Sequence, residues 1–413
     1  MAINTIIYNI GSLATVAGHK GPARGETLAE VGLLSGAALA IEADKIVAVG
    51  TEAEILAMAD ETTLLINAEQ GLVTPGLVDP HTHLVYGGDR AYEWTLKQQG
   101  VSYLEILAQG GGILSTVRQT RQAGHAKLKQ ESTKRLQTML QYGTTTAEAK
   151  SGYGLDLTTE LLQLDLVKEL NESQPVQLVS TFMAAHAFPE EYAGQREAYV
   201  NLIIEQMLPQ VADKAAFCDV FCEEGVFTVE ESRKILLAAA KHGMRAKLHA
   251  DELAASGGSL LAAELKAISA DHLLMSDPLG HQAMATAGVI GVCLPATSFY
   301  LAQGHYAPAR SMLDEGMAIA LATDANPGSS PTENMQLVIS IACLYLKLTP
   351  AEALVAATLN SAHAIGLGDS IGSLEAGKQA DIAIFDVPSL AYLPYHFGVN
   401  QVKHVLKRGK LVF

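Results

Sequence analysis

Between residues 71 and 325, short hydrophobic runs alternate with longer stretches in which apolar residues recur at helical spacing. Helical patterns such as 125–143 and 228–243 separate these runs, and Gly243 closes the second pattern as a C-cap residue. The runs with strand character are 71–79, 143–149, 176–185, 217–224, 244–251, 267–274, 288–297 and 317–325. Eight strand–helix repeats predict an α/β fold, a TIM-like (β/α)8 barrel. An open doubly wound sheet is the alternative, but a count of eight favours closure.

The two ends of the chain have a different pattern. Residues 4–16, 38–50, 62–69 and 402–413 are β-like pieces that need no helix between them. We expect the two ends to pair into one small β-sandwich domain beside the barrel. The predicted division is therefore 1–70 for the N-terminal part of the sandwich, 71–365 for the barrel and 366–413 for the C-terminal part.

Composition narrows the function classes. The chain has 413 residues, 49% of them hydrophobic and 17% charged, which is typical of a well-buried globular protein. A net charge of −16 argues against a nucleic-acid partner, and an anionic substrate would need a local arginine or lysine. No apolar run approaches the roughly 20 residues of a membrane span.

The four cysteines form no CxxC pair, and no basic segment precedes the first apolar stretch. We therefore expect a soluble cytoplasmic protein with reduced thiols. A homodimer is one option for its assembly. The apolar helix at 336–348 fits either the core or an interface, and the core is favoured.

Candidate chemistry collects where the predicted strands end, which is the active-site face of such a barrel. His81 and His83 are two residues apart at the end of the first strand and therefore point the same way. The other strand ends supply His186, then His249 with Glu252, then Asp271 with His272, and finally Asp324. A lone histidine there is more often a core residue, but five of the 13 histidines with an aspartate indicate a metal site.

These ligand types suit zinc or iron rather than calcium or magnesium. Three histidines and one aspartate, completed by water, are typical of a catalytic site, and a divalent metal brings the pKa of bound water to about 7. Asp324 is placed to take a proton from that water, and Glu252 to deliver one to a leaving nitrogen. Together these groups indicate hydrolysis of a C–N bond.

Four stretches resemble the amidohydrolase superfamily: PGLVDPHTHL at 75–84, HADE at 249–252, the aspartate after the eighth strand, and IGSLEAGKQADIAIFD at 371–386. Within it the chain resembles the imidazolonepropionase family. The stretches that carry this resemblance are HTHLVYGGDRAYEW (81–94), GGGILSTVRQTR (110–121), TTTAEAKSGYGLD (144–156), DVFCEEGVFT (219–228), LHADELAASGG (248–258), ISADHLL (268–274) and ATDANPGSSPTE (322–333).

The resemblance implies a TIM-like barrel with a β-sandwich and one Zn²⁺ or Fe³⁺ per subunit. It also implies the hydrolytic ring opening of 4-imidazolone-5-propanoate to N-formimidoyl-L-glutamate, a step of histidine degradation. In this reaction a metal-activated water attacks the ring carbonyl.

The resemblance also implies the number of metals. Two-metal members of the superfamily carry a bridging lysine after strand four, and residues 221–225 contain none. A single metal held by His81, His83, His249 and Asp324 is therefore favoured, with His272 orienting the water or polarising the carbonyl. Glu223 or Glu224 as a further ligand stays open.

For the substrate, the resemblance implies contacts from Arg90, Tyr153, His186 and Glu252. Arg90 could bind the propanoate tail through two hydrogen bonds. Taken alone, Arg90 would more often be a surface ion-pair partner and Tyr153 an ordinary loop residue.

The stretch DANPGSSPTENM at 324–335 predicts a helix N-terminus. Ser330, Pro331 and Glu333 fit the N-cap, N1 and N3 positions of a helix toward residue 348. That leaves Asn326, Gly328 and Ser329 beside free amides that favour an anion, although a capped helix without a ligand has the same pattern.

The glycine run at 110–112 lacks the rest of a phosphate-binding motif, and we expect a flexible loop over the barrel mouth. Two other functions remain open: a ring deaminase or another cyclic amidase of the same superfamily, and a barrel retained as a non-catalytic scaffold.

Overall fold

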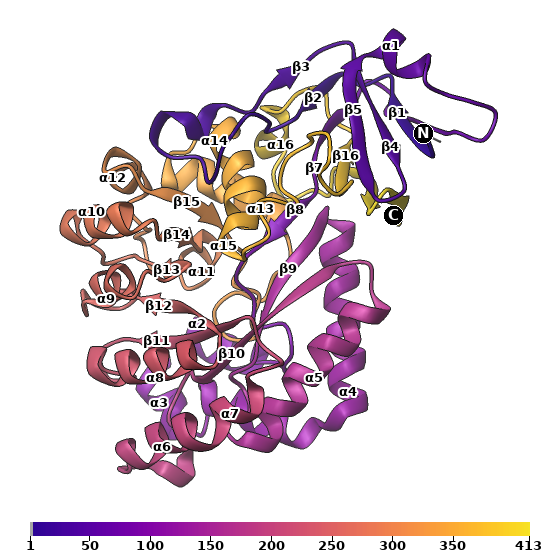
Figure 1. The fold of residues 1–413 in the computed structure, drawn as a ribbon. Coiled ribbons are helices and arrows are strands. Elements are labelled where there is room, and N and C mark those ends of the chain that lie inside the picture. Colours follow the sequence, from indigo (N-terminus) through magenta and orange to yellow (C-terminus); the bar gives the residue numbers. More distant parts are fainter. Residues whose placement is uncertain (1–2) are drawn as a thin grey trace.

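The computed structural model describes residues 3–413, without the side chains of residues 103 and 104, and consists of a barrel and a β-sandwich (Figure 1). The eight barrel strands pair in parallel, each with the next along the chain. They are β8 (Leu77–Asp79), β9 (Thr144–Lys150), β10 (Gln177–Ala185), β11 (Phe217–Cys222), β12 (Arg245–Ala250), β13 (Ser269–His272), β14 (Ile290–Cys293) and β15 (Ala318–Leu321).

The barrel is closed by the residues that follow its first and last strands. Thr82 and Ala325 form a parallel bridge, the Asp324 N–H donates to the His81 carbonyl at 3.2 Å, and the His83 N–H donates to the Ala325 carbonyl at 3.0 Å. The prediction of a closed barrel is confirmed, and the open sheet is excluded. Closure at this end places the two histidines beside the aspartate that lies more than 240 residues later in the chain.

Helices surround the barrel (Figure 1). Those that connect its strands are α2 (Ala91–Gln98), α3 (Tyr103–Ala108), α4 (Ile113–Gln141), α5 (Leu157–Ser173), η2 (Glu190–Tyr192), α6 (Arg196–Leu202), η3 (Ile203–Met207), α7 (Leu208–Val211), α8 (Val229–Lys241), α9 (Gly258–Glu264), α10 (Pro278–Ala287), α11 (Pro295–Tyr300) and α12 (Ala309–Asp314). After β15 come α13 (Met335–Ile341), η4 (Ala342–Leu346), α14 (Pro350–Val355), η5 (Ala356–Asn360) and α15 (Ser361–Ala364).

Two helix predictions can be compared directly with the structure. α8 begins after the capping box of Thr228 and Glu231 and ends just before Gly243, as predicted. α4 begins at Ile113, twelve residues earlier than predicted. Gly124 (φ 70°, ψ 166°) divides α4 into two helical segments, and the predicted helix corresponds to the segment after this glycine. The sequence pattern detected only the second segment.

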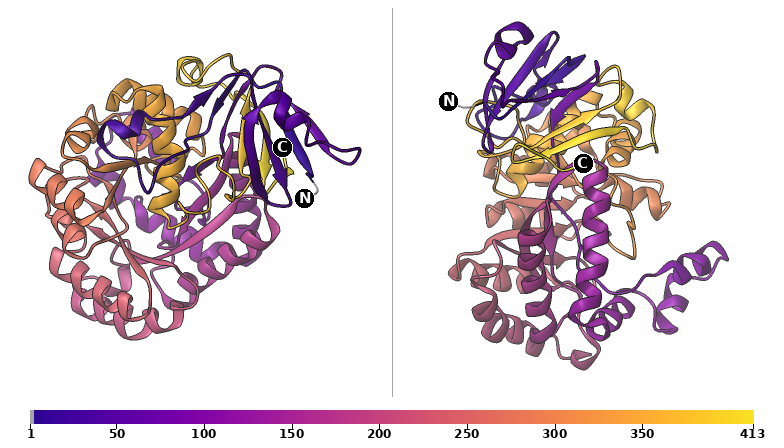
Figure 2. Two further views of the ribbon diagram at one scale, coloured as in Figure 1. Left: turned by 45° about the horizontal axis from the view of Figure 1, so that its top comes forward. Right: turned by 90° about the vertical axis from the view of Figure 1, so that its right-hand side faces the viewer.

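The chain ends form two sheets that pack as a sandwich, and both termini lie there (Figure 2, left). Its apolar core includes Ile7, Leu39, Val73 and Ile384. One sheet has the order β5-β4-β1-β6 and the other β18-β17-β16-β7-β2-β3. The bounds are β1 (Thr5–Tyr8), β2 (Ser12–Ala14), β3 (Leu33–Leu34), β4 (Ala37–Glu42), β5 (Lys45–Thr51), β6 (Leu64–Asn67), β7 (Leu72–Pro75), β16 (Ile382–Phe385), β17 (Val402–Lys407) and β18 (Lys410–Leu411).

Three short helices accompany these strands: η1 (Gly25–Ala29), α1 (Glu52–Leu56) and α16 (Tyr392–Tyr395). The prediction of a sandwich built from both chain ends is confirmed.

The single strand predicted over 71–79 is wrong, because the run divides between the two parts of the fold. β7 pairs with β16 and β2 in the sandwich, whereas β8 pairs with β9 in the barrel. Gly76 joins them in close contact with Thr145, where an added Cβ would lie 2.9 Å from the threonine Cβ. A continuous apolar run therefore crosses from one sheet to another without a sequence signal.

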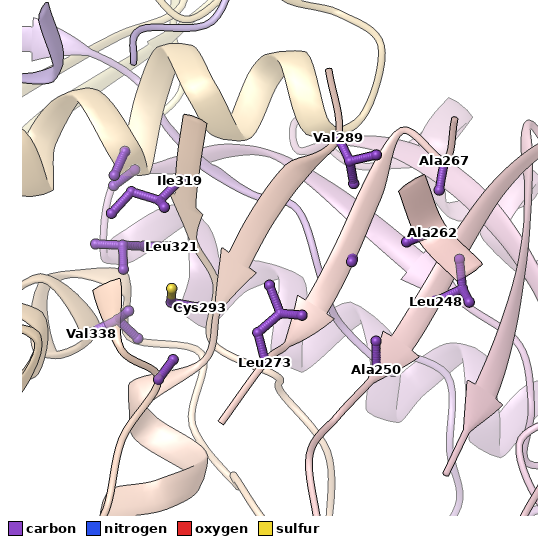
Figure 3. Close-up of a cluster of buried hydrophobic side chains, with 14 of the residues drawn as sticks. Leu248, Ala250, Ala262, Ala267, Leu273, Val289, Cys293, Ile319, Leu321 and Val338 are labelled. Carbon is purple, nitrogen blue, oxygen red and sulfur yellow. The ribbon is translucent and has the colours of Figure 1, made fainter. Parts of the chain in front are cut away.

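Strand residues facing outward pack on the helices. Figure 3 shows part of one cluster of buried apolar side chains, which includes Leu248, Leu273, Cys293 and Leu321 of the barrel and Val338 of α13. The helix predicted at 336–348 is mostly buried, as favoured, although Leu344 is 56% exposed. The inward-facing positions carry polar side chains instead, and these build the site.

α2 and α3 extend away from the barrel as an arm (Figure 2, right). The glycine run at 110–112 is the turn between α3 and α4, and Gly112 is the N-cap residue of α4. The loop expected at this glycine run is therefore a short turn, because α4 begins directly after it at Ile113.

Candidate active site

The candidate residues converge on one cavity of about 320 Å³. The candidates that line it are His83, Arg90, Tyr153, His186, His249, Glu252, His272, Asp324, Asn326, Gly328 and Ser329, whereas His81 is fully buried and is not a lining residue. Phe221, Ile113 and Leu301 add apolar surface. The cavity thus combines titratable groups with a partly apolar wall, as small-molecule sites do.

The histidines and Asp324 are close enough to share a metal ion. Asp324 Oδ1 lies 3.5 Å from His81 Nε2 and 3.6 Å from His83 Nε2, and His83 Nε2 lies 3.4 Å from His249 Nε2. Ligand atoms of His81, His83 and His249 lie within 4.8 Å of one another, as do those of His81, His272 and Asp324. These groups come from the ends of β8, β12, β13 and β15.

Two aspartates orient two of the histidines. His81 Nδ1 lies 2.6 Å from Asp271 Oδ2, and His249 Nδ1 lies 3.0 Å from Asp219 Oδ1. A carboxylate on Nδ1 fixes the tautomer and turns the Nε2 lone pair toward a metal. From the sequence, Asp271 is expected only as a strand-end residue without a stated role, and Asp219 is not among the candidates. Their inward positions on β13 and β11, two residues from other inward-facing side chains, were the available signal.

The donors fit a divalent metal ion. His81 Nε2 is buried and has no hydrogen-bond partner among the described residues, although buried polar atoms are normally paired. Burial holds the pKa of His81, His83 and His272 well below the ordinary value, which leaves neutral imidazoles able to act as ligands. Burial also lowers the pKa of His249, but the facing Asp219 carboxylate outweighs it, so the net shift is upward.

The two candidate proton carriers have raised pKa values. Burial, and secondly the charge of Asp324, raises the pKa of Glu252 to about 8. Burial raises the pKa of Asp324 to about 6, while a hydrogen bond from Thr297 Oγ1 at 2.7 Å opposes the shift. At neutral pH one carboxyl group therefore carries a proton and the other does not, which is the pairing that acid–base catalysis uses.

Two residues that line the cavity have strained backbone conformations. His272 (φ 77°) and Asp324 (φ 56°) both adopt left-handed conformations that side chains other than glycine disfavour. Such strain persists where the surrounding contacts require it, and here it occurs at two residues that face the cavity.

Arg90 lies in the cavity wall rather than on the surface. Its side chain is 13% exposed, and Glu93 accepts from Nε at 2.9 Å and from the terminal nitrogen NH2 at 2.8 Å. The other Glu93 oxygen accepts the Gly112 N–H at 3.0 Å. The guanidinium is therefore oriented by the turn between α3 and α4, and it does form the ion pair that a surface arginine would form.

Tyr153 and His186 lie side by side near the histidine cluster. The Glu160 carboxylate holds the Tyr153 loop by accepting the N–H groups of Gly154 at 2.9 Å and Leu155 at 2.8 Å. The His186 ring stacks on His83 at 4.7 Å between centroids, and burial lowers the pKa of His186 to about 3.

The predicted helix N-terminus at Ser330 is wrong. α13 begins at Met335, and the Asn334 side chain caps it by accepting the Leu337 N–H. Ser330 is buried and donates its hydroxyl to the Thr323 carbonyl at 2.6 Å, so it cannot serve as the cap.

The amides expected to be free for an anion are also occupied. The N–H groups of Gly328 and Ser329 both donate to Asn326 Oδ1 at 2.8 Å. An anion in this corner of the cavity would meet the Arg90 guanidinium rather than a helix terminus.

Known proteins were compared with this chain. Residues 72–412 match the amidohydrolase family. An imidazolonepropionase from Alkaliphilus oremlandii is 53% identical over 100% of this chain and 98% of its own length. One from Bacillus velezensis is 50% identical over 99% and 97%. The chain belongs to the imidazolonepropionase family of amidohydrolases.

Solved structures agree with the amidohydrolase fold. Guanine deaminase from E. coli superimposes with a TM-score of 0.76 at 15% identity, over 99% of this chain and 98% of that one. A zinc-bound adenosine deaminase from Xanthomonas campestris gives a TM-score of 0.74 at 21% identity, over 99% of this chain and 93% of that one.

Over residues 3–413, none of the helices is long and apolar enough to cross a membrane.

Glu223, for which the sequence leaves a role as metal ligand open, has another role in this amidohydrolase. Its carboxylate accepts the N–H groups of Glu252 at 2.8 Å and Leu253 at 2.9 Å, and it also accepts from Ser256. It therefore positions the loop that carries Glu252. Within the described residues, neither Glu223 nor Glu224 belongs to a group of side chains able to share a metal.

Gly328 leaves room for the Arg90 guanidinium in the cavity of this imidazolonepropionase family member. A Cβ at this position would overlap one terminal nitrogen of Arg90 and lie 2.8 Å from its Cζ. Gly328→Ala is therefore expected to displace the guanidinium and raise KM for a carboxylate-bearing substrate by roughly 10-fold, with kcat little changed. Initial rates over a substrate series test this.

Gly21→Ala is the matched control, because nothing lies within 4 Å of a Cβ there. Arg90→Ala should raise KM at least as much as Gly328→Ala. An unchanged KM in both cavity variants would remove Arg90 from the substrate site.

Proposed function

We propose that this chain hydrolyses the ring amide of 4-imidazolone-5-propanoate and releases N-formimidoyl-L-glutamate. The observation that carries the proposal is one cavity that brings together the histidine–aspartate cluster, the Glu252 carboxyl group and the Arg90 guanidinium. Relatives at about half identity over the full length carry the name imidazolonepropionase. The free thiols and the lack of a membrane-spanning helix in the described residues are compatible with a cytoplasmic enzyme.

The metal is assigned to His81, His83, His249 and Asp324. Imidazole nitrogens with one carboxylate oxygen suit a zinc or iron ion. When bound, the ion lowers the pKa of water and stabilises negative charge on a neighbouring oxygen.

The protein residues handle the protons. Asp324, ionised at neutral pH, accepts a proton from the attacking water at Oδ1, the oxygen nearest His81 and His83. Glu252, protonated at neutral pH, donates a proton to the ring nitrogen as its bond to the carbonyl carbon breaks. His272 Nδ1 lies 3.6 Å from Glu252 Oε1. The His272 side chain polarises the ring carbonyl. The water oxygen ends on the new carboxylate of the product.

The remaining cavity residues hold the substrate. Arg90 binds the propanoate carboxylate with its terminal nitrogens, and the buried Tyr153 hydroxyl donates to the same group. His186 contacts the ring edge beside His83. Asn326, Gly328 and Ser329 form the wall that faces Arg90.

A ring deaminase is the second candidate, since two deaminases share the fold. Metal-loaded protein is incubated with 4-imidazolone-5-propanoate, guanine and cytosine, and loss of each substrate and release of ammonia are followed. Ring opening of the imidazolone alone, without free ammonia, is the expected result. Ammonia release from a purine or pyrimidine together with no action on the imidazolone would contradict the proposal.

A further inference from the structure

A lysine lies at the centre of the barrel, beneath the histidine cluster. Lys150 ends β9 with its side chain fully buried. Its Nζ donates to Glu148 Oε1 and to Asp219 Oδ2, both at 2.7 Å, and lies 3.8 Å from Asp271 Oδ2. Burial lowers the pKa of Lys150, but the surrounding carboxylates outweigh it and hold the pKa above the ordinary value. The ammonium is therefore charged.

The two aspartates around this ammonium are the ones that hold histidines. Asp219 uses Oδ2 for Lys150 and Oδ1 for His249 Nδ1, at 2.7 and 3.0 Å. Asp271 uses Oδ2 both for the longer contact with Lys150 and for His81 Nδ1 at 2.6 Å. The Lys150 ammonium therefore lies next to the carboxylate partners of both His249 and His81, which are far apart in the sequence.

The backbone of the same lysine is tied to the first strand. Its N–H donates to the Thr82 carbonyl at 2.9 Å, and Thr82 lies between His81 and His83. Glu148 contacts this segment too, since its Oε2 accepts the Thr82 N–H at 3.3 Å. Lys150 therefore contacts the backbone between His81 and His83, and it also contacts Asp219, the carboxylate partner of His249.

Another buried lysine, Lys247, shares only the longer contact with Asp271. Lys247 Nζ donates to the carbonyls of Pro80 and Ala364 at 3.3 Å and lies 3.9 Å from Asp271. Without Lys150, Glu148 and Asp219 would lack their cationic partner inside the barrel. Buried carboxylates left in that state rearrange or take up protons, because an unpaired buried charge is costly.

We propose that Lys150 is a positioning residue of the metal site: its ammonium holds Asp219 by a hydrogen bond and places a positive charge 3.8 Å from Asp271, so that His249 and His81 present Nε2 to one metal ion. The inference rests on the proposed metal ligands. Replacing Lys150 would affect metal binding through the two aspartates, because the lysine itself does not contact the metal. Loss of such outer contacts typically weakens metal binding by about 10–100-fold.

The test compares Lys150→Met with the parent and with Lys407→Met. Lys407 is a buried lysine of the sandwich that donates to Asp381 at 2.7 Å, so its replacement breaks a similar ion pair away from the site. The Zn²⁺ dissociation constant of each metal-free protein is measured by competition with a chromophoric chelator, and thermal unfolding is followed in parallel. The visible spectrum of each protein after loading with Co²⁺ reports ligand geometry.

We expect both variants to unfold at lower temperature, but only Lys150→Met to bind Zn²⁺ about 10–100-fold more weakly and to change the Co²⁺ spectrum. Zn²⁺ affinity and a Co²⁺ spectrum like those of the parent would overturn the inference. So would equal losses of affinity in both variants, which would indicate a general effect of stability. A parent that binds no metal would instead overturn the proposed function.

If Lys150→Met does not fold, Lys150→Gln is measured in the same way, because its amide fills the space without the charge. Asp219→Asn provides a further test on the link to His249 and must also weaken Zn²⁺ binding. Parent affinity in the folded member of this series contradicts the inference.

Discussion

Asp324→Asn is expected to lower kcat by about 10³-fold or more while the protein still folds. The substitution removes the negative charge 3.5 Å from His81 Nε2 and 3.6 Å from His83 Nε2, and with it the proposed ligand and proton acceptor. Asparagine keeps the size of the side chain and an oxygen that can accept from Thr297. Steady-state rates, metal content and thermal unfolding are measured on the same samples.

Asp381→Asn is the control for loss of a buried aspartate. Asp381 is 4% exposed and accepts from Lys407 in the sandwich, away from the cavity. Any loss of stability in this control should leave kcat within about two-fold of the parent. An Asp324→Asn protein that turns over substrate near the parental rate would remove Asp324 from the mechanism.

Glu252→Gln is expected to lower kcat by about 10²–10⁴-fold, the range for loss of a general acid, without loss of metal. The pKa of Glu252 is raised to about 8, chiefly by burial, so the carboxyl group is protonated and able to donate at neutral pH. As the pH rises through this value the acid form is lost, and kcat/KM of the parent should fall. Glutamine does not titrate, so the variant should lack this alkaline limb.

Glu352→Gln controls for removal of a buried glutamate, since Glu352 is 7% exposed and pairs with Arg310 on the outer helices. Its pH profile should match that of the parent. If Glu252→Gln retained the parental rate or the same alkaline limb, another group would have to protonate the leaving nitrogen.

Much of this site could be predicted because strand geometry is regular. Two histidines separated by one residue must share a face, and the carboxyl ends of parallel strands meet at one rim. His81, His83, His249 and Asp324 follow from that reasoning, and the structure brings them together. Their roles as metal ligands stay a prediction until a metal is observed.

The supporting residues could not be predicted in the same way. Asp219 and Lys150 lie within strands, where a charged residue has no local pattern to indicate its partner. Their pairing depends on which strands become neighbours in the closed barrel. A long-range contact of this kind is visible only in three dimensions.

Local competition explains the errors at the last barrel loop. Ser330 and Glu333 have the spacing of a capping box, but Asn326 forms a turn with Gly328 and Ser329, and Ser330 bonds back to Thr323. These bonds use the groups that would start the helix, so the cap moves to Asn334.

Anomalous diffraction from crystals of the metal-loaded protein, recorded at the absorption edge of the bound metal, would locate the ion relative to the three histidines and Asp324. We expect a single peak per chain within coordination distance, about 2.0–2.2 Å, of His81 Nε2, His83 Nε2, His249 Nε2 and an Asp324 oxygen. A peak elsewhere, or no peak in protein that opens the imidazolone ring, would show that these four residues do not hold a catalytic metal.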